Sequence, residues 1–188
     1  MKLMLKILLV FLLTAGCVFA AGCMGSPQPA EEEVPWTLTL VGFDGIQKNL
    51  SVSEVRALPS QSGNGYGVST VGIKYGPYKI KGVALRDLLR EVGGVAPNQT
   101  VHVSAADGYL WVFSYEQLQG EDLLCLDLNL KEMKEPVQML PILMYEADGK
   151  PYPYDDGGPF RVATMTERPD VITEGSLWVK WVDRIEVH

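Results

Sequence analysis

The chain has 188 residues, of which 47% are hydrophobic and 9% aromatic, and its formal net charge is −7. Such a composition is typical of a protein with a buried core and excludes an intrinsically disordered chain. The acidic balance also argues against nucleic-acid binding, which depends on Lys and Arg to neutralise phosphates. We therefore expect no nucleic-acid partner.

The first residues have the pattern of a targeting segment. Lys2 and Lys6 give a positive start, residues 7–13 are an unbroken apolar run, and small residues precede Cys17 and Cys23. This order is typical of a secretory signal peptide, and the apolar stretch is too short to span a membrane comfortably. We expect residues 1–22 to be a signal peptide and the protein to be exported.

The small residues before the second cysteine also resemble the lipobox of prokaryotic lipoproteins. In that class the cysteine after Ala-Gly is lipidated, which points to Cys23 here, or to Cys17 in a second such box. Residues 23–35 are rich in Ser, Pro and Glu and predict a disordered tether. The resemblance implies a protein on the outer face of the cell membrane, held by an N-terminal lipid. The alternative is plain secretion without a lipid.

The first half of the mature chain predicts short strands and two helices. Residues 36–41 alternate as a half-buried strand, residues 42–45 form a turn, and Ser51 to Glu54 have the spacing of a capping box. Residues 60–67 are polar and Gly-rich and predict a loop. Strands follow at 68–73 and 78–80. Residues 83–92 predict an amphipathic helix that ends at Gly93-Gly94.

The second half predicts further strands separated by turns. The strand segments are 100–104, 109–113, 141–145, 159–164 and 177–187, with turns at 107–108 and 148–149 and one helical turn from Ser114. Short strands with few helices and no regular βαβ alternation predict an α+β domain over residues 36–188.

Soft metal ligands are scarce in the mature domain. Cys125 is its single cysteine outside the lipobox region, so no disulfide forms within the domain, and its apolar neighbours predict a buried thiol. His102 and His188 do not complete a zinc or haem spacing. The acidic residues between 145 and 156 lack the spacing of an EF-hand calcium loop. We expect no metal site from these patterns.

Six segments in one order resemble the molybdopterin-binding domain of the sulfite oxidase family. They are Trp36–Gly42, Leu50–Pro59, Gly82–Leu89, Val101–Tyr109, Gly157–Arg161 and Val179–Val187. The resemblance covers residues 36–188 and implies a mixed fold with several sheets and a few short helices. It also implies a cleft for molybdopterin, whose molybdenum is ligated by a cysteine thiolate in that family.

The resemblance places the family's ligand cysteine near Thr70, where this chain has Ser69 and Thr70 instead. A hydroxyl, with its much higher pKa, is a poor substitute for a thiolate. The family pattern places Arg161 and Lys180 near the pterin and its phosphate, and Asp156 stands where sulfite oxidases carry a histidine. Tyr109 could line the same cleft. We therefore name no catalytic residue and favour no bound cofactor, although molybdopterin is an alternative.

Three functional hypotheses follow from this pattern. The first is a non-catalytic lipoprotein that binds a small ligand or a protein partner through the former cofactor cleft. The second is a molybdopterin-dependent oxidoreductase with an atypical metal site. The third is a structural subunit of a surface redox complex, for which we expect an exposed apolar patch and a filled cleft.

Overall fold

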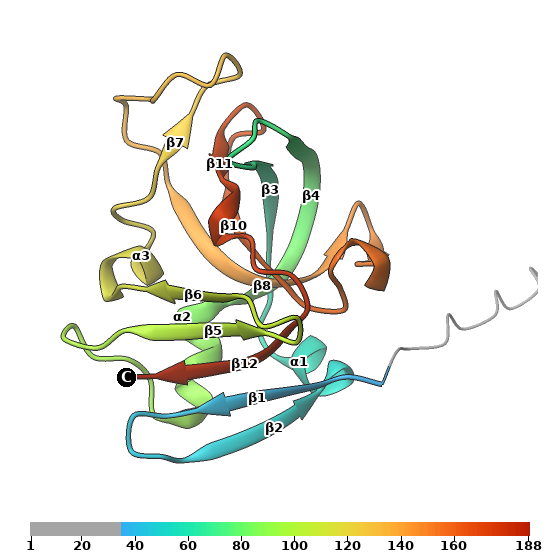
Figure 1. Ribbon diagram of the computed structural model, residues 1–188, viewed down its shortest axis with the longest axis vertical. Coiled ribbons are helices and arrows are strands. Elements are labelled where there is room, and N and C mark those ends of the chain that lie inside the picture. The colour runs from blue at the N-terminus through green and yellow to red at the C-terminus, as the bar shows by residue number, and fades with distance from the viewer. Residues whose placement is uncertain (1–34) are drawn as a thin grey trace, which may run out of the picture. The chain divides into compact units, whose positions relative to one another are not determined.

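The computed structural model describes residues 35–188, so the predicted signal peptide, both lipobox cysteines and nearly all of the tether lie outside the described residues. Figure 1 shows two β-sheets with short helices between and beside them. None of the helices in the described part of the chain is long and apolar enough to cross a membrane.

The smaller sheet contains five strands in the order β2-β1-β12-β5-β6. β1 pairs antiparallel with β2, whereas β12, which comes last in chain order, lies parallel to β1 and antiparallel to β5 (Figure 1). The bounds are β1 Thr37–Val41, β2 Gln47–Ser51, β5 Val101–Ala105, β6 Leu110–Phe113 and β12 Val182–Val187. The predicted strands in these regions are confirmed to within a few residues, except that the last one begins at residue 182.

The larger sheet contains seven strands, in the order β10-β8-β4-β3-β11-β7 with β9 beside β8. Because β10 also pairs with β3, the strands β3, β4, β8 and β10 close into a circuit. The bounds are β3 Gln61–Val68, β4 Lys74–Ala84, β7 Cys125–Leu126, β8 Met139–Ala147, β9 Lys150–Pro151, β10 Arg161–Thr166 and β11 Ile172–Glu174.

Short helices connect the strands. They are the α-helices α1 Val52–Ala57, α2 Leu85–Leu88 and α3 Tyr115–Gln119, and the 3-10 helices η1 Leu89–Val92, η2 Tyr154–Asp156 and η3 Gly175–Leu177. All but η2, which lies between β9 and β10 of the larger sheet, link one sheet to the other. The predicted helix over 83–92 is thus an α-helical turn continued by η1, and Gly93 ends it with a φ of 98°. Its apolar side belongs to one core that includes buried residues of both sheets, among them Leu40, Ile142 and Ile185.

The predicted loop over 60–67 is wrong, because these residues form most of β3. The composition is polar and Gly-rich and so does not have the pattern of a strand. The glycines are needed because neighbouring side chains lie close to the backbone of β3. A Cβ on Gly65 would lie 2.7 Å from Ile80 Cδ1, and one on Gly67 would lie 2.9 Å from Tyr75 Cδ2. Glycine in a strand often marks such a close approach.

The predicted strand over 68–73 is also wrong. Ser69–Ile73 is the turn of the β3–β4 hairpin, and the backbone N–H of Ile73 donates to Ser69 Oγ over 2.9 Å. The apolar side chains of Val71 and Ile73 are exposed there. Gly76 and Pro77, which lie between the two predicted strands, are part of β4, where the pairing register with β3 shifts.

Candidate functional site

A cavity of about 320 Å³ lies where the β3–β4 turn, the β5–β6 turn and the segment from β11 to β12 come together. Its lining residues are Ser69, Thr70, Tyr75, Asp107, Tyr109, Arg161, Gly175, Ser176, Trp178 and Lys180. The structure therefore brings five of the six sequence-predicted site residues to one place, although they span more than a hundred positions of the chain. Asp156 does not line the cavity.

Arg161 is the central cation of the cavity. It begins β10, and only 3% of its surface is exposed. Its one hydrogen bond among the described residues runs from Nη1 to the hydroxyl oxygen of Tyr152 over 2.7 Å. A guanidinium has five N–H donors, and Nε of Arg161 is buried without an acceptor. None of the ion pairs within residues 35–188 involves Arg161, so its charge is left without a carboxylate.

Aromatic rings surround the Arg161 guanidinium. Its Cζ lies 5.0 Å from the ring centre of Tyr75, 5.3 Å from that of Trp178 and 5.8 Å from that of Tyr152. Cation–π contacts of this kind stabilise a desolvated guanidinium, but they leave its in-plane N–H groups able to donate to an anion. Burial raises the pKa of Tyr152, and the charge of Arg161 partly opposes that rise.

Trp178 is held from two sides. Its indole N–H donates to Thr173 Oγ1 over 3.1 Å. On another side its ring packs against the bare backbone of β3, since a Cβ on Gly65 or Gly67 would come within 3.1 Å of the ring. The glycines of β3 therefore help to set the position of a ring that faces Arg161.

Lys180 gives the cavity a second positive charge. The backbone of Gly157, with a φ of 110°, comes so close to the Lys180 stem that a Cβ there would lie 2.6 Å from Lys180 Cγ. The Nζ atom lies 5.5 Å from the ring centre of Trp181. Among the described residues Lys180 forms no ion pair. The Gly157–Arg161 motif thus supplies one cation and orients the other.

Another part of the cavity wall carries polar and acidic groups. The Tyr109 hydroxyl donates to the carbonyl oxygen of Ser176 over 3.0 Å, and the Ser176 hydroxyl donates to the carboxylate of Glu174. Burial, followed by the nearby Glu174 charge, raises the pKa of Tyr109, so the phenol stays protonated at neutral pH. Asp107 lines this wall too, a residue that the sequence marks only as part of an Asp-Gly turn.

Ser69 and Thr70 reach the cavity from the tip of the β3–β4 hairpin. Ser69 Oγ already accepts the N–H of Ile73, so part of its bonding capacity closes the turn. Both side chains present hydroxyls where the family resemblance implies a thiolate.

Asp156 lies in η2 and is exposed, outside the cavity. Burial is the main cause that raises the pKa of Tyr152, and the charge of Asp156 adds a smaller contribution. Asp156 is thus the one predicted site residue that the structure places outside the cavity lining, and its role at the site stays a prediction.

Cys125 does not line the cavity. It is buried in β7, as the sequence predicts, within a separate small cluster with Met139 and Val171. Burial, and then the charge of Glu132, raises the pKa of its thiol. A group held in its neutral form is a weak nucleophile and a weak metal ligand.

Residues 35–188 contain no cluster of three or more His, Cys, Asp or Glu side chains that could hold a metal ion. His102 stacks on His188 in the smaller sheet, with ring centres 3.9 Å apart. The cavity places two cations, one of them deeply buried, beside aromatic rings and hydroxyls. Such a lining suits a small anion that carries a flat or apolar body.

Comparisons with known proteins agree with the fold. A family described as the oxidoreductase molybdopterin-binding domain matches residues 25–188. Among solved structures, the sulfane dehydrogenase SoxCD from Paracoccus pantotrophus is similar, with a TM-score of 0.59 and 16% sequence identity. The match covers 81% of this chain and 38% of that one, so the present chain spans well under half of its length. No curated protein matches the sequence.

Proposed function

The chain belongs to the oxidoreductase molybdopterin-binding domain family, and from this premise we propose that it is a non-catalytic member that binds a small anionic ligand in the family's cleft. The proposal includes export and an N-terminal lipid anchor. The observation that carries it is the state of Arg161, a buried guanidinium with one hydrogen bond and no carboxylate partner. A buried charge without a counter-ion is costly, and an anionic ligand would offset that cost.

The residues of the cavity fit one part of the family's cofactor and not another. Arg161, Lys180 and the rings of Tyr75 and Trp178 suit a phosphate and a flat heterocycle. They supply no thiolate for the metal, because the described chain places its cysteine, Cys125, in another cluster. The proposal therefore involves no step through molybdenum. A cavity of about 320 Å³ is also near the lower end of the size range of ligand pockets.

The second candidate is a molybdopterin-dependent oxidoreductase with an atypical metal site. One observation favours it, since the hydroxyls of Ser69 and Thr70 line the same cavity as Arg161 and Lys180. In that case molybdopterin would supply the redox chemistry, Arg161 and Lys180 would bind its phosphate, and a hydroxyl would stand beside the metal.

The first experiment separates the two candidates. Molybdenum and tungsten are measured by elemental mass spectrometry on protein purified from its native host, together with an assay for released pterin. We expect neither metal nor pterin in stoichiometric amounts. About one metal and one pterin per chain would overturn the non-catalytic proposal, and substitution of Thr70, Ser69 and Cys125 would then identify the ligand.

The second experiment tests anion binding itself, with inorganic phosphate as the probe and the thermal unfolding midpoint as the readout. We expect phosphate to raise the midpoint of the wild type, and Arg161→Lys and Lys180→Gln to reduce that rise. Arg168→Gln is the matched control, because Arg168 is exposed and paired with Asp170 away from the cavity. An equal rise in all four proteins would show that phosphate acts elsewhere and would contradict the proposal.

A further inference from the structure

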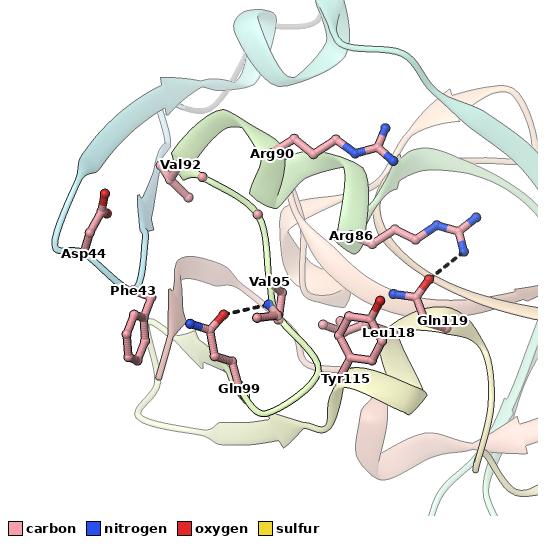
Figure 2. Close-up of a pocket in the computed structure, with 13 residues that line it drawn as sticks. Phe43, Asp44, Arg86, Arg90, Val92, Val95, Gln99, Tyr115, Leu118 and Gln119 are labelled. Carbon is pink, nitrogen blue, oxygen red and sulfur yellow. Dashed lines mark hydrogen bonds between the residues drawn. The ribbon is translucent and has the colours of Figure 1, made fainter.

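A second and larger cavity, of about 530 Å³, lies on another part of the domain and shares no lining residue with the first. Figure 2 shows it between the β1–β2 turn, the α2–η1 helix, the loop that follows η1, and α3. Its volume is within the range of small-molecule sites. Neither the family resemblance nor the proposed function assigns a role to it.

Two arginines one helical turn apart dominate one end of this cavity. Arg86 and Arg90 project in the same direction from α2–η1, and both line the cavity (Figure 2). Nη1 of Arg86 donates to Gln119 Oε1 over 3.3 Å, and Arg86 takes part in none of the ion pairs formed within residues 35–188. Arg90 forms an ion pair with Asp87, with Nη1 and Oδ1 3.0 Å apart.

The charges at this end leave one positive charge without a partner. Within the described residues Asp87 compensates Arg90, whereas the hydrogen bond of Arg86 goes to a neutral amide oxygen. One unpaired guanidinium matches a singly charged carboxylate, which it can bind through two parallel hydrogen bonds. A doubly charged phosphate would keep an uncompensated negative charge there.

The rest of the cavity is suited to an apolar body. Val95 and Leu118 line it, and Phe43 stands at the other end in the view of Figure 2 with 66% of its surface exposed. Asp44 lies beside Phe43 and would repel an anion at that end. Gln99 uses its amide oxygen to accept the N–H of Ala96 over 2.7 Å, which leaves its NH₂ group as a donor.

We infer that this cavity is a second ligand site, which takes a small organic monocarboxylate with an apolar or aromatic body. The carboxylate lies against Arg86, and the body extends over Val95 towards Phe43. The orientation follows from the charges, since the unpaired cation and Asp44 lie at opposite ends.

The test uses phenylacetate as the probe and the isotope-labelled full chain as the sample. Two-dimensional NMR spectra are recorded during titration with phenylacetate, with its neutral analogue phenylacetamide, and with inorganic phosphate. We expect saturable shifts at Arg86, Tyr115 and Leu118 with phenylacetate only. Loss of the charged hydrogen bonds in Arg86→Gln should weaken binding at least about tenfold.

Two further variants make the result decisive. Arg168→Gln changes the net charge by the same amount far from the cavity lining and should bind phenylacetate as the wild type does. Phe43→Ala removes an exposed ring without touching the core and should weaken binding severalfold.

The inference is overturned if phenylacetamide binds equally well, if Arg86→Gln leaves the affinity unchanged, or if phenylacetate at about 20 mM produces no saturable shift. Arg161→Lys should not alter this binding, so failure here is distinct from failure at the first cavity.

Discussion

The buried charge of Arg161 depends on contacts with residues that are far from it in the chain. The rings of Tyr75 and Trp178 stabilise its guanidinium. The Trp178 ring in turn packs against a face of β3 that carries no side chains, because Gly65 and Gly67 lie there. The environment of the charge is therefore set by residues that carry no charge themselves.

Substitution of Gly67 tests the contacts of β3 with Tyr75 and Trp178. A Cβ there would lie 2.9 Å from Tyr75 Cδ2 and 3.1 Å from Trp178 Cε2, so both rings must move. We expect Gly67→Ala to lower the free energy of unfolding by about 1–3 kcal/mol, as overpacking in a core does. Urea unfolding followed by tryptophan fluorescence measures the change.

Gly63→Ala is the matched control in the same strand. A Cβ at Gly63 would lie 2.6 Å from Cγ of the flexible Met165 side chain, which can move away, and 3.1 Å from the backbone oxygen of Thr166, a contact that a small shift relieves. This substitution should therefore cost less than Gly67→Ala. Equal losses at both positions would show that the backbone of β3, rather than the fit against Tyr75 and Trp178, determines the effect.

At the residue scale, the sequence predicts the cations of the site but not their surroundings. Arg161, Lys180, Ser69, Thr70 and Tyr109 all line one cavity, as the family resemblance implies. Asp107 is missed because an Asp-Gly pair already has a sufficient explanation as a turn. Trp178 is missed because an aromatic residue within an apolar run is indistinguishable from ordinary core until its partners are known.

The secondary-structure elements that the sequence predicts are those with a local signal, such as a capping residue. The capping box at Ser51 is confirmed: its side chain accepts the N–H of Glu54, and the Glu54 carboxylate accepts the N–H of Ser51 over 2.8 Å. The helical turn predicted from Ser114 is likewise capped, with Gln117 in the reciprocal role. β3 has no such signal, because its existence depends on pairing with β4, β10 and β11.

The cap of α1 gives a pH-dependent prediction. Hydrogen bonds from the backbone and side chain of Ser51 lower the pKa of Glu54. A carboxylate with a lowered pKa in the folded state stabilises the fold above its unfolded pKa, and this contribution is lost as the pH falls through the folded value. We expect Ser51→Ala to cost about 1 kcal/mol near neutral pH, and the cost to shrink on acidification.

Urea unfolding of both proteins at about pH 7 and about pH 3 measures this difference. Glu54→Gln is the control, since its amide can still accept from the cap while it carries no charge. In that background the effect of Ser51→Ala should no longer depend on pH. A cost that stays constant in the wild-type background would exclude the role assigned to the Glu54 charge.

For the whole molecule, charge and the proposed lipid anchor have to be considered together. The net charge of −7 becomes more negative once residues 1–22 are removed, because that segment carries two lysines and no acid. A surface of this kind is not attracted to anionic lipid headgroups. Residence at a membrane would therefore depend on the lipid and not on the folded domain.

Cysteine substitutions in the native host test the anchor. We expect metabolic labelling with palmitate to mark the wild type and Cys17→Ser but not Cys23→Ser, and the last variant to appear in the soluble fraction. Labelling of Cys23→Ser with loss of label in Cys17→Ser would assign the lipid to the first box. Soluble, unlabelled wild-type protein would favour plain secretion.

The parallel pairing of β1 with β12 determines when the smaller sheet can form during synthesis. β12 lies between β1 and β5 and is the last strand in chain order. Until the ribosome has released it, β1 and β5 have no partner between them and the smaller sheet cannot assemble. Pairings between such distant parts of a chain are slow to form. The smaller sheet should therefore stay unformed until β12 has emerged from the ribosome, which would keep this part of the chain available to any machinery that requires an extended polypeptide.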